Sequence, residues 1–326
     1  MAAPVRFALL FAGSVLAFGV PAKGQVPDEI REKLLAIGFG DSLEPSMAIY
    51  EPLLLAAAPK GDLVIEKDVR YGEHERNLLD LYRPGGIEGA AVLVYVHGGG
   101  YRTGDRDLNP LVYANVPTYF GRHGLLAMSV TYRLAPQANW PSGAEDMRAL
   151  VAWVRENARR LGGDPDRVYL MGHSAGATHV ATYAFDARFQ EAEGHGLAGI
   201  VLVSGRYRLR SDPDDPSLDS IREYFGGDPA KYESRSAISH VPGSEVPALL
   251  VVAEYDQRNL VETTGELFVA LCRRDDGRCP RFLQLRHHNH LSEVFHINTG
   301  DEILGREILE FVEAGAARQR ERARAR

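Results

Sequence analysis

The sequence has few cysteines and no excess of positive charge, and these two shortages narrow the functions that it can have. Only two of its 326 residues are cysteine, and 37 lysine and arginine residues stand against 44 aspartate and glutamate residues. An acidic chain with no basic stripe between aromatic side chains is a poor candidate for nucleic-acid binding. Repeats, low-complexity blocks and a clear interdomain linker are also missing. A hydrophobic content of 45% then predicts one sizeable globular domain or two small ones.

The hydrophobic run at the N-terminus, from Phe7 to Val20, is too short to span a bilayer comfortably. It follows one positive charge at Arg6 and leads into Pro21-Ala22-Lys23-Gly24, which predicts a secretory signal peptide over residues 1–24. No cysteine follows the run, which argues against lipid attachment. We expect an exported protein, periplasmic or secreted, without stable membrane insertion after signal removal; an uncleaved anchor is the alternative. Loss of Arg6 and Lys23 changes the formal net charge from −7 to −9.

The two cysteines, Cys272 and Cys279, are separated by a polar, turn-like segment. In the oxidising compartment that export implies, this spacing favours a disulfide that closes the loop. Two cysteines without neighbouring ligands make a poor metal site.

The middle and end of the chain alternate between strand-like and helix-like patterns. Residues 25–60 have helical spacing at Glu29–Ile37 and Met47–Ala58 but no motif, so we expect a helical arm or a small lid. An antiparallel hairpin is predicted over residues 63–65 and 77–82. Six apolar runs follow, at residues 91–96, 125–131, 168–171, 199–203, 248–252 and 282–285, and the clearest helix spans Ser142 to Leu161. Residues 61–326 are therefore predicted to form an α/β domain whose mostly parallel, eight-stranded sheet has helices on both faces.

The pentapeptide Gly172-His173-Ser174-Ala175-Gly176 lies between the apolar run 168–171 and a small-residue segment that favours a helix. A serine at a sharp strand-to-helix turn has its hydroxyl exposed, which is the context of a nucleophile. Glycine and serine also crowd ordinary turns, so the role of Ser174 depends on partners elsewhere in the chain.

A glycine-rich segment, His97-Gly98-Gly99-Gly100-Tyr101, follows the apolar strand at residues 91–96. Unobstructed backbone N–H groups of this kind stabilise the negative oxygen that develops during acyl transfer. We predict an oxyanion hole formed by Gly98, Gly99 and Ala175, which begins a helix and adds its positive end. A flexible glycine loop is the alternative, but it fits poorly directly after so apolar a strand.

A base and a carboxylate are expected after the last two strands, because parallel strands open on the same side of a sheet as Ser174. The strand at residues 248–252 leads to Glu254 and Asp256; we favour Asp256, further into the loop, although it is also a possible helix cap. The last strand leads into a histidine-rich stretch that ends at His290. The order Ser174, Asp256, His290 is that of a catalytic triad in an α/β-hydrolase sheet.

Three other features have less specific patterns. The histidine cluster, which extends to His296, raises zinc as an alternative. The acidic segment from Ser211 to Pro216 lacks the spacing of a calcium loop. His179 is interpreted as a buried structural histidine. We therefore expect no metal ion and no organic cofactor.

Four ordered motifs resemble those of one enzyme family. They are His97-Gly98-Gly99-Gly100, Tyr132-Arg133-Leu134-Ala135-Pro136, Glu145-Asp146 and the serine pentapeptide. Over roughly residues 62–315 the chain is similar to α/β-hydrolase esterases of the hormone-sensitive-lipase and feruloyl-esterase-like groups. In such enzymes the carboxylate follows the seventh strand and the histidine the eighth, which implies Asp256 and His290. The family's His-x-His-Leu pattern favours His290 over His288.

Departures from the family pattern bear on the substrate. His173 stands where hormone-sensitive-lipase relatives usually have aspartate, Ala177-Thr178 replaces Gly-Asn, and Ala253 stands where glycine is common. The resemblance then implies the feruloyl-esterase or arylformamidase-like branch. The segment from Gly205 to Val241 is short for a large cap domain.

We therefore expect a serine carboxylic ester hydrolase for small or aryl esters, acting through Ser174, His290, Asp256 and an acyl-enzyme. The expected partner is a small-molecule ester. An amidase or arylformamidase with the same triad is one alternative. A catalytically inactive hydrolase fold that serves as a binding protein is the other.

Overall fold

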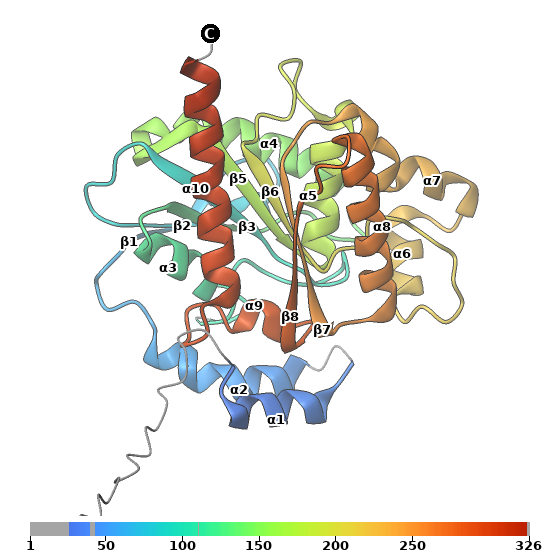
Figure 1. The fold of residues 1–326 in the computed structure, drawn as a ribbon, viewed down its shortest axis with the longest axis horizontal. Helices are drawn as coiled ribbons and strands as arrows, with labels where there is room; N and C mark the ends of the chain where they lie inside the picture. The colour runs from blue at the N-terminus through green and yellow to red at the C-terminus, as the bar shows by residue number, and fades with distance from the viewer. Residues whose placement is uncertain (1–25, 40–42, 110, 325–326) are drawn as a thin grey trace, which may run out of the picture.

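The computed structural model describes residues 26–39, 43–109 and 111–324, and side chains up to residue 317. The predicted signal peptide over residues 1–24 lies outside the described residues. The architecture is one eight-stranded sheet with the order β1-β2-β4-β3-β5-β6-β7-β8 (Figure 1). β2 is antiparallel to both β1 and β4, and the other neighbouring pairs are parallel. The predicted mostly parallel sheet is thus confirmed.

The strands are β1 (Val64–Arg70), β2 (Leu78–Arg83), β3 (Ala90–Val96), β4 (Leu126–Val130), β5 (Gly163–His173), β6 (Gly199–Val203), β7 (Ala248–Tyr255) and β8 (Arg281–Asn289). The helices are α1 (Asp28–Ile37), α2 (Leu43–Ala56), α3 (Asn115–Arg122), α4 (Ser142–Asn157), α5 (Ala175–Phe185), α6 (Leu218–Phe225), α7 (Tyr232–Arg235), α8 (Arg258–Arg274), α9 (Ser292–Phe295) and α10 (Ile303–Arg324).

The element boundaries differ from the predicted ones mainly at polar ends. β5 begins at Gly163, before the predicted run at Val168, because its polar first residues extend along β3. β7 and β8 extend past their apolar runs into the candidate site. The predicted helix from Ser142 to Leu161 is divided into α4 and a short 3-10 turn at its end.

Two apolar cores cover the two faces of the sheet, because alternate residues of a strand point to opposite sides. On β3, Val92, Val94 and Val96 face one core, while Leu93 and Tyr95 face the other. Helices α4, α5 and α8 cover the first face, and α3, α9 and α10 cover the second. The helices on both faces confirm the predicted α/β arrangement.

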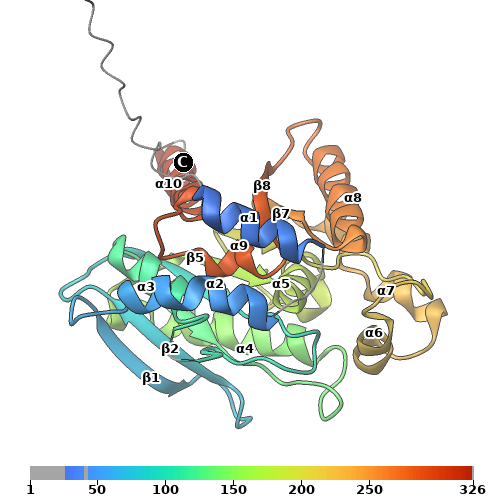
Figure 2. The same cartoon turned by 90° about the horizontal axis from the view of Figure 1, so that it is seen from below.

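The N-terminal helices α1 and α2 lie across the end of the sheet where β7 and β8 finish (Figure 2). Leu34, Tyr50 and Leu54 anchor them in the second core. The ring of Phe39, just after α1, meets the ring of Tyr255 edge-on at 5.7 Å. The helices predicted within residues 25–60 are therefore present, and α2 begins at Leu43, earlier than expected. Their action as a lid stays a prediction.

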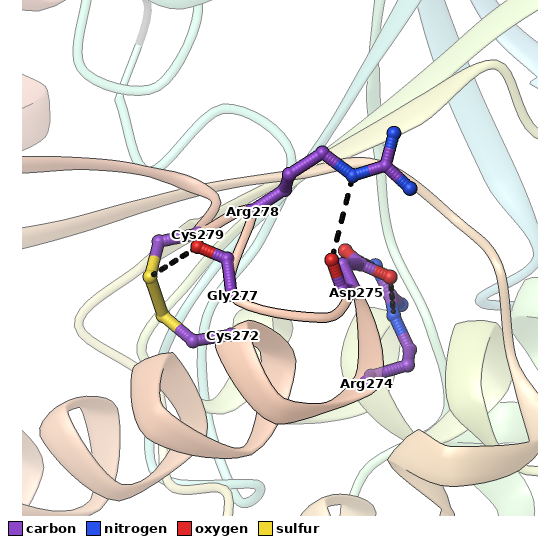
Figure 3. The surroundings of a disulfide bond; sticks show 6 residues. All are labelled: Cys272, Arg274, Asp275, Gly277, Arg278 and Cys279. Carbon is purple, nitrogen blue, oxygen red and sulfur yellow. Dashed lines mark hydrogen bonds and ion pairs between the residues drawn. A yellow bond between two sulfur atoms is a disulfide. The ribbon is translucent and has the colours of Figure 1, made fainter.

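Cys272, in the last turn of α8, forms a disulfide with Cys279, which precedes β8 (Figure 3). The predicted bond between the two cysteines is confirmed. Among the described residues, none of the helices combines the length and apolar character needed to cross a membrane.

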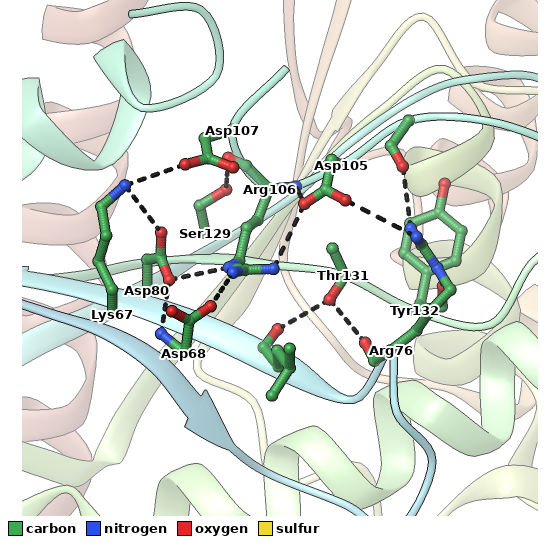
Figure 4. Close-up of polar contacts among 12 residues, drawn as sticks. Lys67, Asp68, Arg76, Asp80, Asp105, Arg106, Asp107, Ser129, Thr131 and Tyr132 are labelled. Carbon is green, nitrogen blue, oxygen red and sulfur yellow. Dashed lines mark hydrogen bonds and ion pairs between the residues drawn. The ribbon is translucent and has the colours of Figure 1, made fainter. Parts of the chain in front are cut away.

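A buried ion pair fixes the segment that follows the glycine-rich loop (Figure 4). Nε of Arg106 donates to Oδ1 of Asp80 on β2 at 2.8 Å, and Asp80 is only 1% exposed. The carbonyl of Arg106 accepts from Ser129 on β4 at 2.7 Å. Lys67 adds a longer contact to Asp80 at 3.7 Å. These contacts hold the chain after the loop against two neighbouring strands.

The turn from β5 into α5 brings the helix into close contact with the sheet. A Cβ on Gly172 would lie 2.5 Å from Cα of Ala177, and one on Gly176 would lie 2.2 Å from the carbonyl oxygen of Val96. Both distances are far below van der Waals contact, so the two positions accept only glycine without a shift of the backbone.

We expect Asp80→Asn to lower the free energy of unfolding by about 2 kcal/mol, because Arg106 loses its buried carboxylate and keeps only the more exposed Asp68 and Asp105. Urea denaturation of the purified protein measures this difference. Asp276→Asn, an exposed aspartate in the loop between the two cysteines, is the matched control and should change stability little. Equal effects of the two substitutions would contradict the role assigned to the ion pair.

We expect Gly176→Ala to destabilise the protein by about 2–3 kcal/mol, because the added methyl group collides with the backbone of β3. The matched control is Gly265→Ala, at an exposed helical position of α8 where a Cβ meets nothing within 4 Å. That change should be neutral or stabilising by up to about 1 kcal/mol. A Gly176→Ala protein as stable as the control would show that α5 does not depend on this contact.

Candidate active site

Ser174 occupies the sharp turn between β5 and α5, with φ 54° and ψ −121°. This conformation is rare for a residue with a side chain and persists only where the surrounding structure holds it. The Ser174 N–H donates to the carbonyl of Val203 on the neighbouring strand β6 at 2.9 Å, which fixes the turn to the sheet. The strand, turn and helix that the pentapeptide predicted are present.

Ser174, His290 and Asp256 meet at the edge of the sheet. Oγ of Ser174 lies 2.9 Å from Nε2 of His290, and Nδ1 of His290 lies 2.9 Å from Oδ1 of Asp256. The carboxylate fixes the tautomer: Nδ1–H donates to Asp256, and Nε2 is left to accept the serine proton. The structure thus brings the three residues predicted as a triad into one hydrogen-bonded line.

Asp256 is buried and still has a low pKa. Burial by itself raises the pKa of this carboxyl, but attraction to His290 and hydrogen bonds from His290, Ser204 and the backbone N–H of Gln257 outweigh it. The net result is a pKa below the usual range for aspartate. The side chain is therefore an anion at neutral pH, the form that orients an imidazole.

The competing candidates of the sequence analysis lie apart from the Ser174 line. Glu254 accepts a hydrogen bond from the backbone N–H of His287 at 2.6 Å and does not belong to the hydrogen-bonded line of Ser174, His290 and Asp256. His288 lies in a separate buried cluster with His296 and Asp301, where one ligand atom of each residue falls within 4.8 Å of the others. Nε2 of His288 is 3.2 Å from Asp301, and its Nδ1 is 3.0 Å from Ser292. These hydrogen bonds account for the burial of His288.

The glycine-rich loop lies directly against Ser174. A Cβ on Gly98 would come within 3.0 Å of the Ser174 Cβ, so the backbone of Gly98 borders the hydroxyl closely. The carbonyl of Gly99 accepts from the backbone N–H of Thr103 at 3.0 Å, which folds the loop back on itself. Within the described residues, no hydrogen bond uses the backbone N–H of Gly98, Gly99 or Ala175. Those three groups are thus available to an oxyanion.

His179 packs as a structural residue. Its ring is buried edge-on against Tyr101, Tyr132 and Tyr224, at centroid distances of 5.5, 4.7 and 5.2 Å. Burial lowers the pKa of His179 to about 3, so it is neutral. This arrangement agrees with the prediction of a structural histidine.

Sequence reasoning missed three buried residues that contact the triad. Ser204 donates to Asp256, Glu293 faces His290, and the pentapeptide residue His173 contacts the carbonyl of His290 at 2.9 Å. A signal for Ser204 was available, since it directly follows β6 as Ser174 follows β5. Glu293 gave no such signal, because its burial depends on how α9 folds back over the sheet.

Two pockets that share Gln257 lie at the site, and Ser174 lines the smaller of them. The inner one, of about 60 Å³, is lined by Ser174, Ala175, Gly100, Tyr101, Arg206, Ser217, Ser220, Gln257 and Leu260. Arg206 in its wall is buried and paired with Asp215 at 2.7 Å. The outer pocket, of about 670 Å³, shares Gln257 with the inner one and extends past Asp256 to Phe39 and Val261.

Known proteins resemble this chain in sequence over part of its length. It is 43% identical to carboxylesterase NlhH of Mycobacterium tuberculosis over 98 residues, 30% of each protein. It is 30% identical to esterase LipC of the same organism over 211 residues, 59% of this chain and 51% of the relative. An isoprenylcysteine alpha-carbonyl methylesterase of Arabidopsis thaliana is 30% identical over 153 residues, 44% of this chain and 35% of that protein. The chain thus spans about half or less of the length of these relatives.

Solved structures with 21–22% sequence identity have the same fold. Esterase B of Lactobacillus rhamnosis matches with a TM-score of 0.68 over 92% of this chain and 100% of its own. An esterase of Pyrobaculum calidifontis matches with a TM-score of 0.65 over 90% and 99%. The family described as alpha/beta hydrolase fold matches residues 93–258, just over half of the chain, a stretch that includes the glycine-rich loop, Ser174 and Asp256. By this match and by its sheet, the chain belongs to the α/β-hydrolase fold family.

Proposed function

We propose that this protein is a serine carboxylic ester hydrolase. The observation that carries the proposal is the line of two 2.9 Å contacts from the Ser174 hydroxyl through His290 to Asp256. A serine hydroxyl is a weak nucleophile, and a base oriented by a buried carboxylate is the arrangement that activates it. The names of the relatives, which are carboxylesterases, esterases and a methylesterase, support the same activity.

In the first half of the proposed reaction, Ser174 Oγ attacks the ester carbonyl carbon while its proton passes to Nε2 of His290. The carbonyl oxygen becomes an anion, which the N–H groups of Gly98, Gly99 and Ala175 stabilise. The positive end of α5 adds to this stabilisation, because Ala175 is its first residue. His290 then gives the proton to the leaving alcohol, the ester C–O bond breaks, and the acyl group remains on Ser174.

In the second half, a water molecule replaces the alcohol. His290 accepts a proton from the water as its oxygen attacks the acyl carbon, and the same N–H groups hold the second oxyanion. The bond to Ser174 Oγ breaks, the serine recovers its proton from His290, and the free acid leaves. Asp256 stays ionised throughout and stabilises the imidazolium of His290 in both halves.

The two pockets support small acyl groups and larger alcohol groups. The inner pocket, of about 60 Å³, is much smaller than the outer one, which suits a short acyl chain. Leu260 and the paired Arg206 close this space. The outer pocket, whose wall combines Phe39 and Val261 with several acidic side chains, has room for an aryl or other bulky alcohol. We assign the inner pocket to the acyl part of the ester and the outer pocket to the alcohol.

We also propose that the protein is exported. The hydrophobic N-terminal run followed by a small-residue segment supports export. The disulfide between Cys272 and Cys279 is consistent with an oxidising compartment.

Ser174→Ala should lower kcat for p-nitrophenyl acetate at least 10³-fold, since loss of a triad nucleophile can lower kcat on the order of 10⁶-fold. It should also abolish labelling by a fluorophosphonate probe. Ser234→Ala, at an exposed position of α7, is the matched control and should keep both activities. Near-full turnover by the Ser174→Ala protein would refute the proposal. Rates on matched ester and anilide substrates separate an esterase from an amidase.

The volume of the inner pocket predicts a preference for short acyl chains. We expect kcat/KM for p-nitrophenyl esters to fall at least tenfold between the butyrate and the octanoate. Leu260→Ala should reduce that difference by enlarging the pocket. A wild-type enzyme that favours the octanoate, or a Leu260→Ala enzyme with an unchanged ratio, would contradict the assignment of the inner pocket to the acyl group.

A further inference from the structure

A second carboxyl group, that of Glu293, lies beside the triad and has no role in the reaction described above. Glu293 belongs to the short helix α9, and its side chain is fully buried. Its Oε1 lies 3.6 Å from Nδ1 of His290 and 3.2 Å from Nε2 of His173. A charge at this position would act directly on the proposed base, so the protonation state of Glu293 matters to the reaction.

The hydroxyl of Ser204 contacts both carboxyl groups. Its Oγ lies 2.8 Å from Oε2 of Glu293 and also makes a hydrogen bond with Oδ2 of Asp256. A hydroxyl has one hydrogen, so Ser204 can donate to only one of the two carboxyl groups at a time. One of the two carboxyl groups must therefore supply the second hydrogen.

The surroundings show which carboxyl group is protonated. Asp256 accepts hydrogen bonds from Nδ1 of His290 and from the N–H of Gln257 in addition to Ser204, and such donors favour the ionised form. Two carboxyl groups this close do not both ionise, because like charges repel in a buried site. The hydroxyl hydrogen of Ser204 thus points to Asp256. The hydrogen between Ser204 and Glu293 is bonded to the Glu293 carboxyl group.

Three other titratable groups near Glu293 carry no positive charge. Burial and the neighbouring His290 lower the pKa of His173 to about 3, and its Nε2–H donates to the carbonyl of His290. Tyr95 on β3 and Tyr207 after β6 interact electrostatically with Glu293, and burial raises the pKa of both phenols. None of these three groups supplies a positive charge that would favour ionised Glu293.

We propose that Glu293 is a protonated positioning residue whose Oε2–H donates to Ser204, which in turn donates to Asp256. The proposal rests on the esterase function proposed above. No proton is transferred along this chain during the reaction. Its effect is to hold the Asp256 carboxylate in place for His290 without adding a second negative charge beside the ring. Oε1, without the hydrogen, is then an acceptor that faces His173.

The conservative variant Glu293→Gln tests the protonation state, because an amide keeps one donor for Ser204 and one carbonyl oxygen while remaining neutral. We expect it to keep kcat within about twofold and to leave the acidic limb of the kcat/KM–pH profile in place. Glu293→Leu and Ser204→Ala remove the donor chain and should each lower kcat about tenfold with little change in KM. Circular dichroism melts identify any variant that fails to fold.

An ionised Glu293 would give a different result. Its replacement by glutamine would remove a negative charge 3.6 Å from His290 and move the acidic limb to lower pH by about one unit or more. That shift, or a Glu293→Gln enzyme as slow as Ser204→Ala, would overturn the proposal.

A spectroscopic measurement separates this proposal from the esterase function. In Ser174→Ala protein, which needs no turnover, the infrared spectrum at neutral pH should contain the carbonyl stretch of a protonated carboxyl. The band should be missing from the Ser174→Ala/Glu293→Gln double variant. If the band is present but the wild-type protein has no esterase activity, only the esterase function is refuted. No difference between the two spectra would refute protonated Glu293 even in an active esterase.

Discussion

Parallel strands that lie side by side end at one edge of the sheet, and the candidate site depends on this constraint. β3, β5, β6, β7 and β8 are consecutive neighbours in the sheet. Each leads directly into one group of the site: in that order, Gly98, Ser174, Ser204, Asp256 and His290. The register of the strands therefore sets the spacing of these five residues, and the two cores that hold the strands also hold the candidate site.

The buried polar side chains around Ser174, His290 and Asp256 contact one another, which offsets part of the cost of their burial. Ser204 connects Asp256 to Glu293, while His173 contacts both Glu293 and the carbonyl of His290. His173 thus has a supporting role beneath the triad and does not line either pocket.

Side chains outside the parallel strands hold the glycine-rich loop in place. The ion pair of Arg106 with Asp80 fixes the segment that follows it to β2. On its other side, Tyr101 stacks on Tyr224 of α6 at a centroid distance of 4.9 Å, so the short segment between β6 and β7 also covers the loop. The loop is therefore supported by charge on one side and by aromatic packing on the other.

Local patterns in the sequence were sufficient for the elements and for the residues that follow them. Apolar runs and helical spacing predicted the eight strands and α4, and the position of Ser174, Asp256 and His290 after strands predicted their meeting at one edge. Such patterns are visible because the spacing of apolar residues and the order of the strands along the chain can be read directly from the sequence.

The tertiary structure alone decided what surrounds the triad. Asp256, which the sequence favoured, contacts His290, whereas Glu254 is still part of β7 and instead accepts from the backbone N–H of His287. Glu293 is buried because α9 folds over the sheet, and α1 and α2 reach the site from the far end of the sequence. Contacts between residues distant in sequence have no local signature, so the polar network and the pocket walls become visible only in the folded chain.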